Sequence, residues 1–295
     1  MQRLAIFFAC LFFVTALAPT IADDTSGLPG GMLSGQFSVD RIGAATYTIP
    51  IVVPPGTAGG TPQISLNYDS HAPDGTTGIG WSVTGFSTVS RCAVRRAGSN
   101  FPVEYDTSDR FCLDGAYLVV NADHEYGSDG ATYYPEKQPW VRVRSYGECP
   151  AIGGTSPCSF VAEQPTGDRV EFGTTDNSSI KAVPDPSAAS DFPLGAVRVW
   201  AATRYVDRNN NEVSFEYEVD ESTGEYLPSV VRYTGNSVAS PALIPQRAVS
   251  FSYQPSATSV LYQGGALIIR SKKLSRIESC IAVSGVDRCD QDTAG

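Results

Sequence analysis

A run of oxygen-bearing side chains after residue 206 has the residue types and part of the spacing of a calcium-binding loop. The ligands would come from the first, third, fifth and twelfth positions of that loop: Asp207, Asn209, Asn211 and Glu218. The sixth position holds Glu212, where such a loop needs a glycine for its sharp turn. The segment also fits an Asn-rich hairpin turn, because Asn tolerates left-handed backbone and bonds its own main chain. Calcium is therefore a weak candidate, and we expect no other cofactor or metal.

Two carboxylates in the same segment form a Glu-x-Glu pair, Glu216-Tyr217-Glu218. The pair resembles that of arginine-specific ADP-ribosyltransferases, in which one carboxylate contacts the nicotinamide ribose and the other lies near the acceptor. However, any Glu-x-Glu on an alternating strand places both side chains on its solvent face. The Ser-Thr-Ser strand and the upstream arginine of those enzymes are not apparent here.

The chain does not have the spacing of a serine hydrolase site. Ser82 lies in Gly80-Trp81-Ser82-Val83-Thr84-Gly85, where Thr84 takes the position that a Gly-x-Ser-x-Gly motif gives to glycine. The two histidines, His71 and His124, lie in turn-like sequences rich in polar residues. We expect no catalytic residue in this chain.

Period-two alternation of apolar and polar residues dominates the chain and predicts β-strands with one face on a core. It is found in these segments: 46–49, 64–68, 141–144, 213–219 and 249–253. Gly and Pro fall mostly between such runs and mark turns. The sequence predicts an all-β fold, a hairpin-rich antiparallel sheet whose C-terminal edge is open.

The first residues have the features of an export signal. Arg3 precedes an apolar run from Leu4 to Ala18, and small residues offer a cleavage site after Ala22. The run is short for a bilayer span, and no other segment is long and apolar enough. The formal charge of −10 disfavours binding to nucleic acid. We therefore predict a secreted protein, with the periplasm as an alternative destination.

Six of the seven cysteines follow the predicted cleavage site. An even number in an exported chain indicates disulfides. Proximity in the sequence favours three local pairs: Cys92–Cys112, Cys149–Cys158 and Cys280–Cys289. Close Cys pairs of the kind that bind zinc are absent from the sequence.

Composition divides the chain into five predicted regions. A signal peptide (1–22) and a flexible leader (23–33) precede a β region (34–183), a connector rich in Pro, Ala and Ser (184–193) and a hairpin series (194–295). The hairpin series is expected to be truncated, because no closing strand or helix follows Cys289.

The order of motifs between residues 43 and 92 resembles the N-terminal domain shared by SpvB and the B components of insecticidal Tc toxins. The matching segments run along the chain as Gly43–Tyr47, Ile49-Pro50, Pro54–Thr57, Leu66–Ser70, Gly78–Trp81 and Ser90-Arg91-Cys92. Residues 109–115, Trp200, 207–211 and 232–236 resemble later blocks of the same family. In all, the resemblance covers about residues 34–281.

The resemblance implies a non-enzymatic structural module of an RHS-repeat-associated toxin. Such a module would contribute sheet to a β-shell that encloses or delivers an effector, and its partners would be the rest of the shell or a Tc-type delivery subunit. Two alternatives remain open. One is an ADP-ribosyltransferase-related toxin fragment that uses Glu216 and Glu218. The other is a stand-alone surface or carbohydrate-binding β-protein, with Trp81 as its aromatic contact.

Overall fold

Antiparallel strands make up almost all of the regular structure. The computed structural model describes residues 34–96, 99–187, 193, 195–282, 285, 288 and 289. The predicted signal peptide, its cleavage site after Ala22, the leader and much of the connector lie outside these residues. Within them, every pair of neighbouring strands is antiparallel, and the one helical element is a 3-10 turn at Thr57–Gly59. The described residues include no helix suited to crossing a bilayer. The all-β prediction is confirmed.

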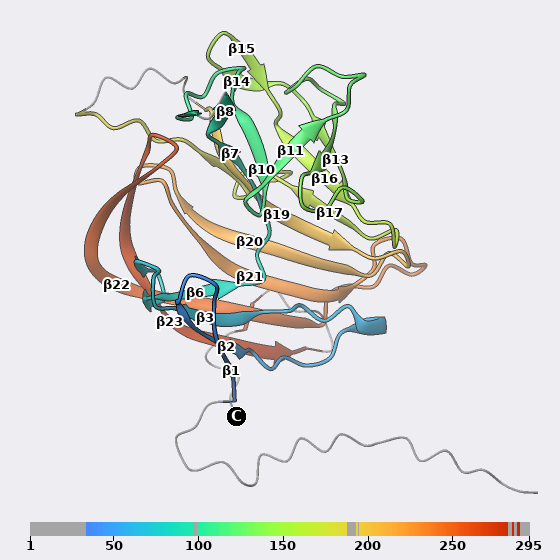
Figure 1. Ribbon diagram of the computed structural model, residues 1–295. Helices are drawn as coiled ribbons and strands as arrows, with labels where there is room; N and C mark the ends of the chain where they lie inside the picture. Colours follow the sequence, from blue (N-terminus) through green and yellow to red (C-terminus); the bar gives the residue numbers. More distant parts are fainter. Residues whose placement is uncertain are drawn as a thin grey trace, which may run out of the picture. The chain divides into compact units, whose positions relative to one another are not determined.

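Eight strands of the largest described sheet close into a ring (Figure 1). In ring order they are β7 (Thr88–Cys92), β10 (Arg110–Leu113), β11 (Ala116–Val120), β12 (Thr132–Pro135), β13 (Arg142–Tyr146), β16 (Ser159–Glu163), β17 (Arg169–Phe172) and β19 (Val197–Val206). The ring closes because β19 pairs with both β7 and β17. Large aromatic side chains fill its interior: Phe111, Tyr133, Phe160, Phe172 and Trp200.

The sheet forks at β19. The first half of β19 pairs with β7 through residues 199–201, whereas the second half pairs with β20 (Glu212–Asp220) through residues 204–206. The other edge of β19 is shared by β17 and the short β18 (Ser179–Lys181). Strands on both sides of residues 184–193 thus belong to one sheet.

A four-strand extension leaves the ring at this fork. It runs from β20 through β21 (Glu225–Gly235) and β22 (Arg247–Gln263) to β23 (Ala266–Ile281), the last strand of the sheet. The tip of the long β22–β23 hairpin returns to the ring. There the buried Arg198 guanidinium donates to the Gln263 side chain (Nη1–Oε1 2.6 Å) and to the Gly224 carbonyl (Nη2–O 2.7 Å). These bonds link the tip of the β22–β23 hairpin and the β20–β21 turn to β19.

A separate four-strand sheet precedes the ring. Its order is β1 (Gln36–Val39), β2 (Ala45–Pro50), β3 (Ser65–Asp69) and β6 (Trp81–Thr84). The segment around it contacts the extension at two places: the Tyr233 hydroxyl donates to the Pro54 carbonyl, and at the outer edge of β23 Leu274 N–H donates to the Thr76 carbonyl. Apolar residues that flank the strands, Ile51 and Val53, pack on the core.

Three small hairpins and three disulfides complete the described structure. The hairpins pair β4 (Asp74–Gly75) with β5 (Gly78–Ile79), β8 (Val94–Arg96) with β9 (Ser99–Phe101), and β14 (Cys149–Ala151) with β15 (Gly154–Ser156). The disulfides join Cys92 to Cys112, Cys149 to Cys158 and Cys280 to Cys289. These are the pairs that proximity in the sequence favours. The first links β7 to β10 in the ring, and the third ties β23 to the chain that follows it.

Candidate functional site

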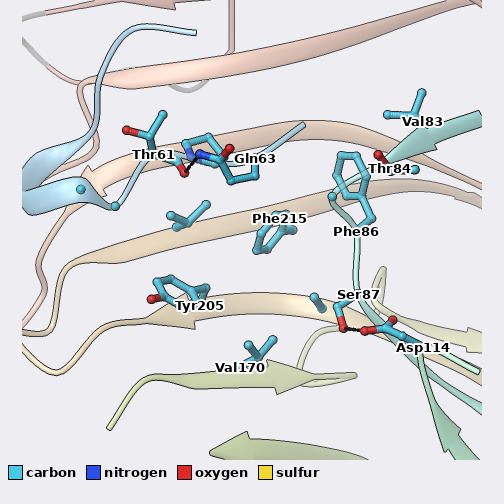
Figure 2. A pocket seen from close by; sticks show the side chains of 16 residues that line it. Thr61, Gln63, Val83, Thr84, Phe86, Ser87, Asp114, Val170, Tyr205 and Phe215 are labelled. Carbon is cyan, nitrogen blue, oxygen red and sulfur yellow. Dashed lines mark hydrogen bonds between the residues drawn. The ribbon is translucent and has the colours of Figure 1, made fainter. Parts of the chain in front are cut away.

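A cavity of about 740 Å³ lies beside the fork (Figure 2). Its apolar floor comes from β17, β19 and β20, with side chains of Val170, Ala202, Tyr205, Val213 and Phe215. Polar groups on its rim come from the 59–63 loop, the end of β6 and the turn before β11. One rim carboxylate, Asp114, accepts hydrogen bonds from the Ser87 hydroxyl (2.6 Å) and from Thr88 N–H (2.8 Å). The size and the apolar lining are typical of a pocket that takes an apolar group.

Phe86 fills the space between β7 and β20, where these two strands diverge along β19. It lies on the short link between β6 and β7, and its ring meets Phe215 and Phe251 edge to face, with centroid distances of 5.9 and 5.5 Å. The Tyr217 hydroxyl donates to the Ala202 carbonyl (2.9 Å). Ala202 lies on β19 between the residues that pair with β7 and those that pair with β20. A carbonyl left there by the diverging strands is thereby satisfied, as buried backbone groups must be.

The face opposite the cavity carries charged side chains on β17, β19 and the extension. Cross-strand ion pairs link Arg204 to Glu171 (2.8 Å) and Arg232 to Glu216 (2.5 Å), and Lys272 also pairs with Glu218. The hydrogen bond to Glu218 is the main cause of the raised pKa of Lys272. Both carboxylates of the Glu-x-Glu pair are therefore paired with cations from other strands, Arg232 on β21 and Lys272 on β23. Each pair of this kind contributes little to stability at an exposed position.

The predicted calcium ligands do not gather around one point. Asp207 is occupied within the β19–β20 turn, where its carboxylate accepts from Asn209 N–H (2.7 Å) and Asn211 N–H (2.8 Å). Partial burial opposes ionisation of Asp207, but hydrogen bonds from Asn211 and Asn209 outweigh it and lower its pKa. Glu218 lies farther along β20, on Lys272. Among the described residues, no cluster of three His, Cys, Asp or Glu side chains is arranged to hold a metal ion.

The remaining candidate residues lie apart on turns and strands. His71 follows β3 in a turn where its N–H binds the Asp69 carboxylate, and His124 lies in a turn after β11; both are exposed. Trp81 is half-buried and packs against Tyr68 with ring centroids 5.3 Å apart. Ser82, on the other face of β6, makes a long contact (3.5 Å) to the Asn67 carbonyl.

The last described strand has a divided outer edge. Backbone N–H groups of Leu267, Ile269 and Leu274 bind carbonyls of residues 183, 223 and 76, respectively. Ser271 N–H binds the buried Glu225 carboxylate instead (3.2 Å). Beyond Leu274, no backbone partner is found for this edge in the part of the chain that the structure describes. The open edge is thus shorter than the strand.

The fork, the cavity and the edge cap could not be read from the sequence. Phe86 stands in the unremarkable run Gly85-Phe86-Ser87, and its role depends on β20 and β22, which lie far along the chain. The sequence around Glu225 likewise does not indicate that its carboxylate caps an amide of β23, because its neighbours are typical only of the start of a strand. The alternation of β20 did predict which of its side chains face the core.

Comparison with known families finds an SpvB-type segment that holds three strands of the four-strand sheet and five of the eight ring strands. Residues 40–152 match the family model described as Salmonella virulence plasmid 65kDa B protein. The match contains the motifs between residues 43 and 92, so the resemblance to the SpvB family is confirmed. No curated protein sequence matches the chain.

Solved structures with similar folds include Tc toxin structures and a domain of SpvB. The chain is similar to the crystal structure of TcdB2-TccC3 (TM-score 0.61, 16% identity), with 84% of this chain and 14% of that chain covered. The Photorhabdus luminescens Tc holotoxin pore gives a TM-score of 0.60 at 14% identity, with 94% and 15% covered. The N-terminal domain of effector protein SpvB from Salmonella typhimurium strain LT2 gives 0.56 at 18% identity, with 78% and 86% covered.

The covered shares differ greatly between these structures. This chain spans about one seventh of the TcdB2-TccC3 chain but most of the SpvB N-terminal domain. At such low identity, the likeness establishes a shared fold. Over most of its own length, the chain therefore shares the β-fold of these structures.

Proposed function

We propose that this protein is an exported structural module of a Tc/RHS-like toxin, which adds preformed sheet to a β-shell that encloses or delivers an effector. The observation that carries the proposal is the extension, which leaves the ring at β19 and ends at β23, whose outer edge beyond Leu274 has no backbone partner among the described residues. Such an edge invites pairing with a further strand. The similarity to one seventh of TcdB2-TccC3 supports a place within a larger assembly. Three disulfides support an oxidising destination.

The coding region that follows residue 295 tests this role directly. We expect it, or a neighbouring gene, to encode RHS-type repeats and a variable C-terminal domain. In the assembled toxin, amide hydrogens of Ile277, Ser279 and Ile281 should exchange much more slowly than in the dilute isolated chain, because a further strand would bind them. The capped amides of Ile269 and Ser271 serve as the internal control and should be protected in both. Absence of repeat-encoding sequence, together with unchanged exchange, would contradict the proposal.

A non-catalytic role is the second part of the proposal. Glu216 and Glu218 are both ion-paired on an exposed, charged sheet face, as structural carboxylates of a strand commonly are, which supports this part of the proposal. When the protein is incubated with labelled NAD and a host-cell lysate, we expect no more label to be transferred to lysate proteins than with a heat-treated sample of the protein. The matched variants are Glu218→Gln and Glu171→Gln, which each remove one partner of an ion pair on this face. Labelling that Glu218→Gln abolishes and Glu171→Gln leaves intact would show an enzyme instead.

A further inference from the structure

The floor of the cavity beside the fork is a cross-strand row of apolar and aromatic side chains. In the register of the sheet, Val170 of β17 lies opposite Tyr205 of β19, and Tyr205 lies opposite Val213 of β20. Phe215 follows two residues after Val213, on the same face of β20, and its ring meets that of Phe86 edge to face. The volume of about 740 Å³ lies in the range of sites that hold a small molecule.

Asp114 is the one lining residue whose side chain is ionised at neutral pH. Burial, together with the nearby carboxylate of Asp168, raises the pKa of Tyr205 to about 12, so the Tyr205 hydroxyl stays neutral. The lining holds no Lys, Arg or His, and none of the ion pairs among the described residues involves Asp114. The cavity thus presents a negative charge without a cation of its own.

The Asp114 carboxylate is held in place by the chain around it. Asp114 and Gly115 form the two-residue turn between β10 and β11, with φ values of 47° and 77° that suit an Asp-Gly hairpin turn. The Asp114 N–H binds the Thr88 carbonyl (3.0 Å), and the carboxylate accepts from the Ser87 hydroxyl and from Thr88 N–H. A carboxylate has about four acceptor sites, so capacity remains for a donor in the cavity. An anchor that is already ordered lowers the entropy cost of binding.

We propose that this cavity binds a small organic cation with an aromatic, apolar body. An ammonium or guanidinium group of the ligand donates to the Asp114 carboxylate in a charge-assisted hydrogen bond. Figure 2 shows Asp114 and Tyr205 on opposite sides of the cavity, with Phe215 between them, so a ligand anchored at Asp114 extends over the apolar floor. The aromatic side chains there favour a ring packed against them. The walls consist of described residues, and the site does not require the proposed role in a toxin shell.

Three indole compounds of nearly equal size test the charge of the ligand. Tryptamine carries an ammonium group, tryptophol has a hydroxyl in its place, and indole-3-acetate carries a carboxylate. Each is titrated into the purified chain, with its three disulfides intact, and binding is followed by ligand-observed NMR. Tryptamine should bind about fivefold more tightly than tryptophol, and indole-3-acetate should show no saturable binding. Equal binding of tryptamine and tryptophol, or saturable binding of neither, would overturn the proposal.

Asp114→Asn tests the anchor, and Asp220→Asn is its matched control. Asp220 is an exposed turn residue outside the lining, and its carboxylate likewise accepts from a serine hydroxyl and a backbone N–H, both of Ser222 (2.6 and 2.9 Å). Asp114→Asn should reduce the affinity for tryptamine to that for tryptophol, whereas Asp220→Asn should change neither. An equal loss in both variants would show general attraction to an acidic protein and would exclude the site at Asp114.

A third variant reduces the cavity itself. Val170 is half-buried on the floor, so Val170→Phe should place a ring in the cavity and weaken tryptamine and tryptophol alike. Val119→Phe adds the same volume at a position that is 51% exposed and outside the lining, and it should change neither affinity. If Val170→Phe kept the free energy of unfolding and still bound tryptamine as tightly, the site would lie elsewhere. If Val170→Phe did not fold, the comparison of Asp114→Asn with Asp220→Asn would still decide the proposal.

Discussion

Replacing Arg91 with methionine is expected to lower the free energy of unfolding by about 3–5 kcal/mol. Arg91 lies on β7, and its guanidinium donates to Asp109 (Nη1–Oδ2 2.8 Å), to the Val197 carbonyl (2.7 Å) and to the Ser156 hydroxyl (2.8 Å). Both side chains of the ion pair are 1% exposed. Methionine would leave the Asp109 carboxylate buried without its cation, and burial already raises the pKa of that carboxyl. Chemical denaturation of the oxidised chain measures the loss.

Two further variants separate the buried charge from its surroundings. Arg142→Met removes an exposed cation from its pair with Glu163 on the ring, and it should cost no more than about 1 kcal/mol. Asp109→Asn combined with Arg91→Met should recover part of the loss, because no charge is then left unpaired. If Arg91→Met were no more harmful than Arg142→Met, the ion pair would not hold the ring together as described.

Replacing Trp200 with alanine is expected to cost about 3–5 kcal/mol. Trp200 is fully buried in the ring, and its ring centroid lies 5.4 Å from that of Phe111 and 5.1 Å from that of Phe160. Alanine would leave a cavity that a closed ring of strands cannot collapse to fill. Thermal and chemical denaturation should both show the change, as a lower midpoint and a smaller free energy of unfolding.

Trp140→Ala is the matched control for this prediction. Trp140 is 60% exposed, so its loss should change the free energy of unfolding by no more than about 0.5 kcal/mol. Trp200→Phe should cost less than Trp200→Ala, since it keeps an aromatic ring and removes a buried indole N–H for which no partner is found among the described residues. Equal losses for Trp140→Ala and Trp200→Ala would contradict the central position of Trp200.

Local patterns predicted much of what the structure contains. Alternation along residues 213–219 predicted a strand with Val213, Phe215 and Tyr217 on the core side, and all three are buried. The turn at Asp207 follows from Asn and Asp chemistry within a few residues. Such features depend on near neighbours in the sequence, so the sequence alone could reveal them.

Long-range pairing lay beyond the sequence patterns. The ring closes because β17 and β7 pair with opposite edges of β19. The alternation of polar and apolar residues within one strand does not indicate which other strand will pair with it. The same holds for Glu225, which caps an amide on β23 across 46 residues. The candidate ligands Asp207 and Glu218 are close in the sequence, but the extended strand β20 separates them in space, and Glu218 pairs with Lys272 instead.

By itself, the sequence determined the all-β class, the side chains that face the core and the SpvB-type segment, because periodicity and motif order are local properties. Only the tertiary structure decided where the sheet forks, which residues line the cavity and how much of the β23 edge stays open. Those features arise from contacts between residues far apart in the chain, whose partners are chosen by the packing of the whole fold.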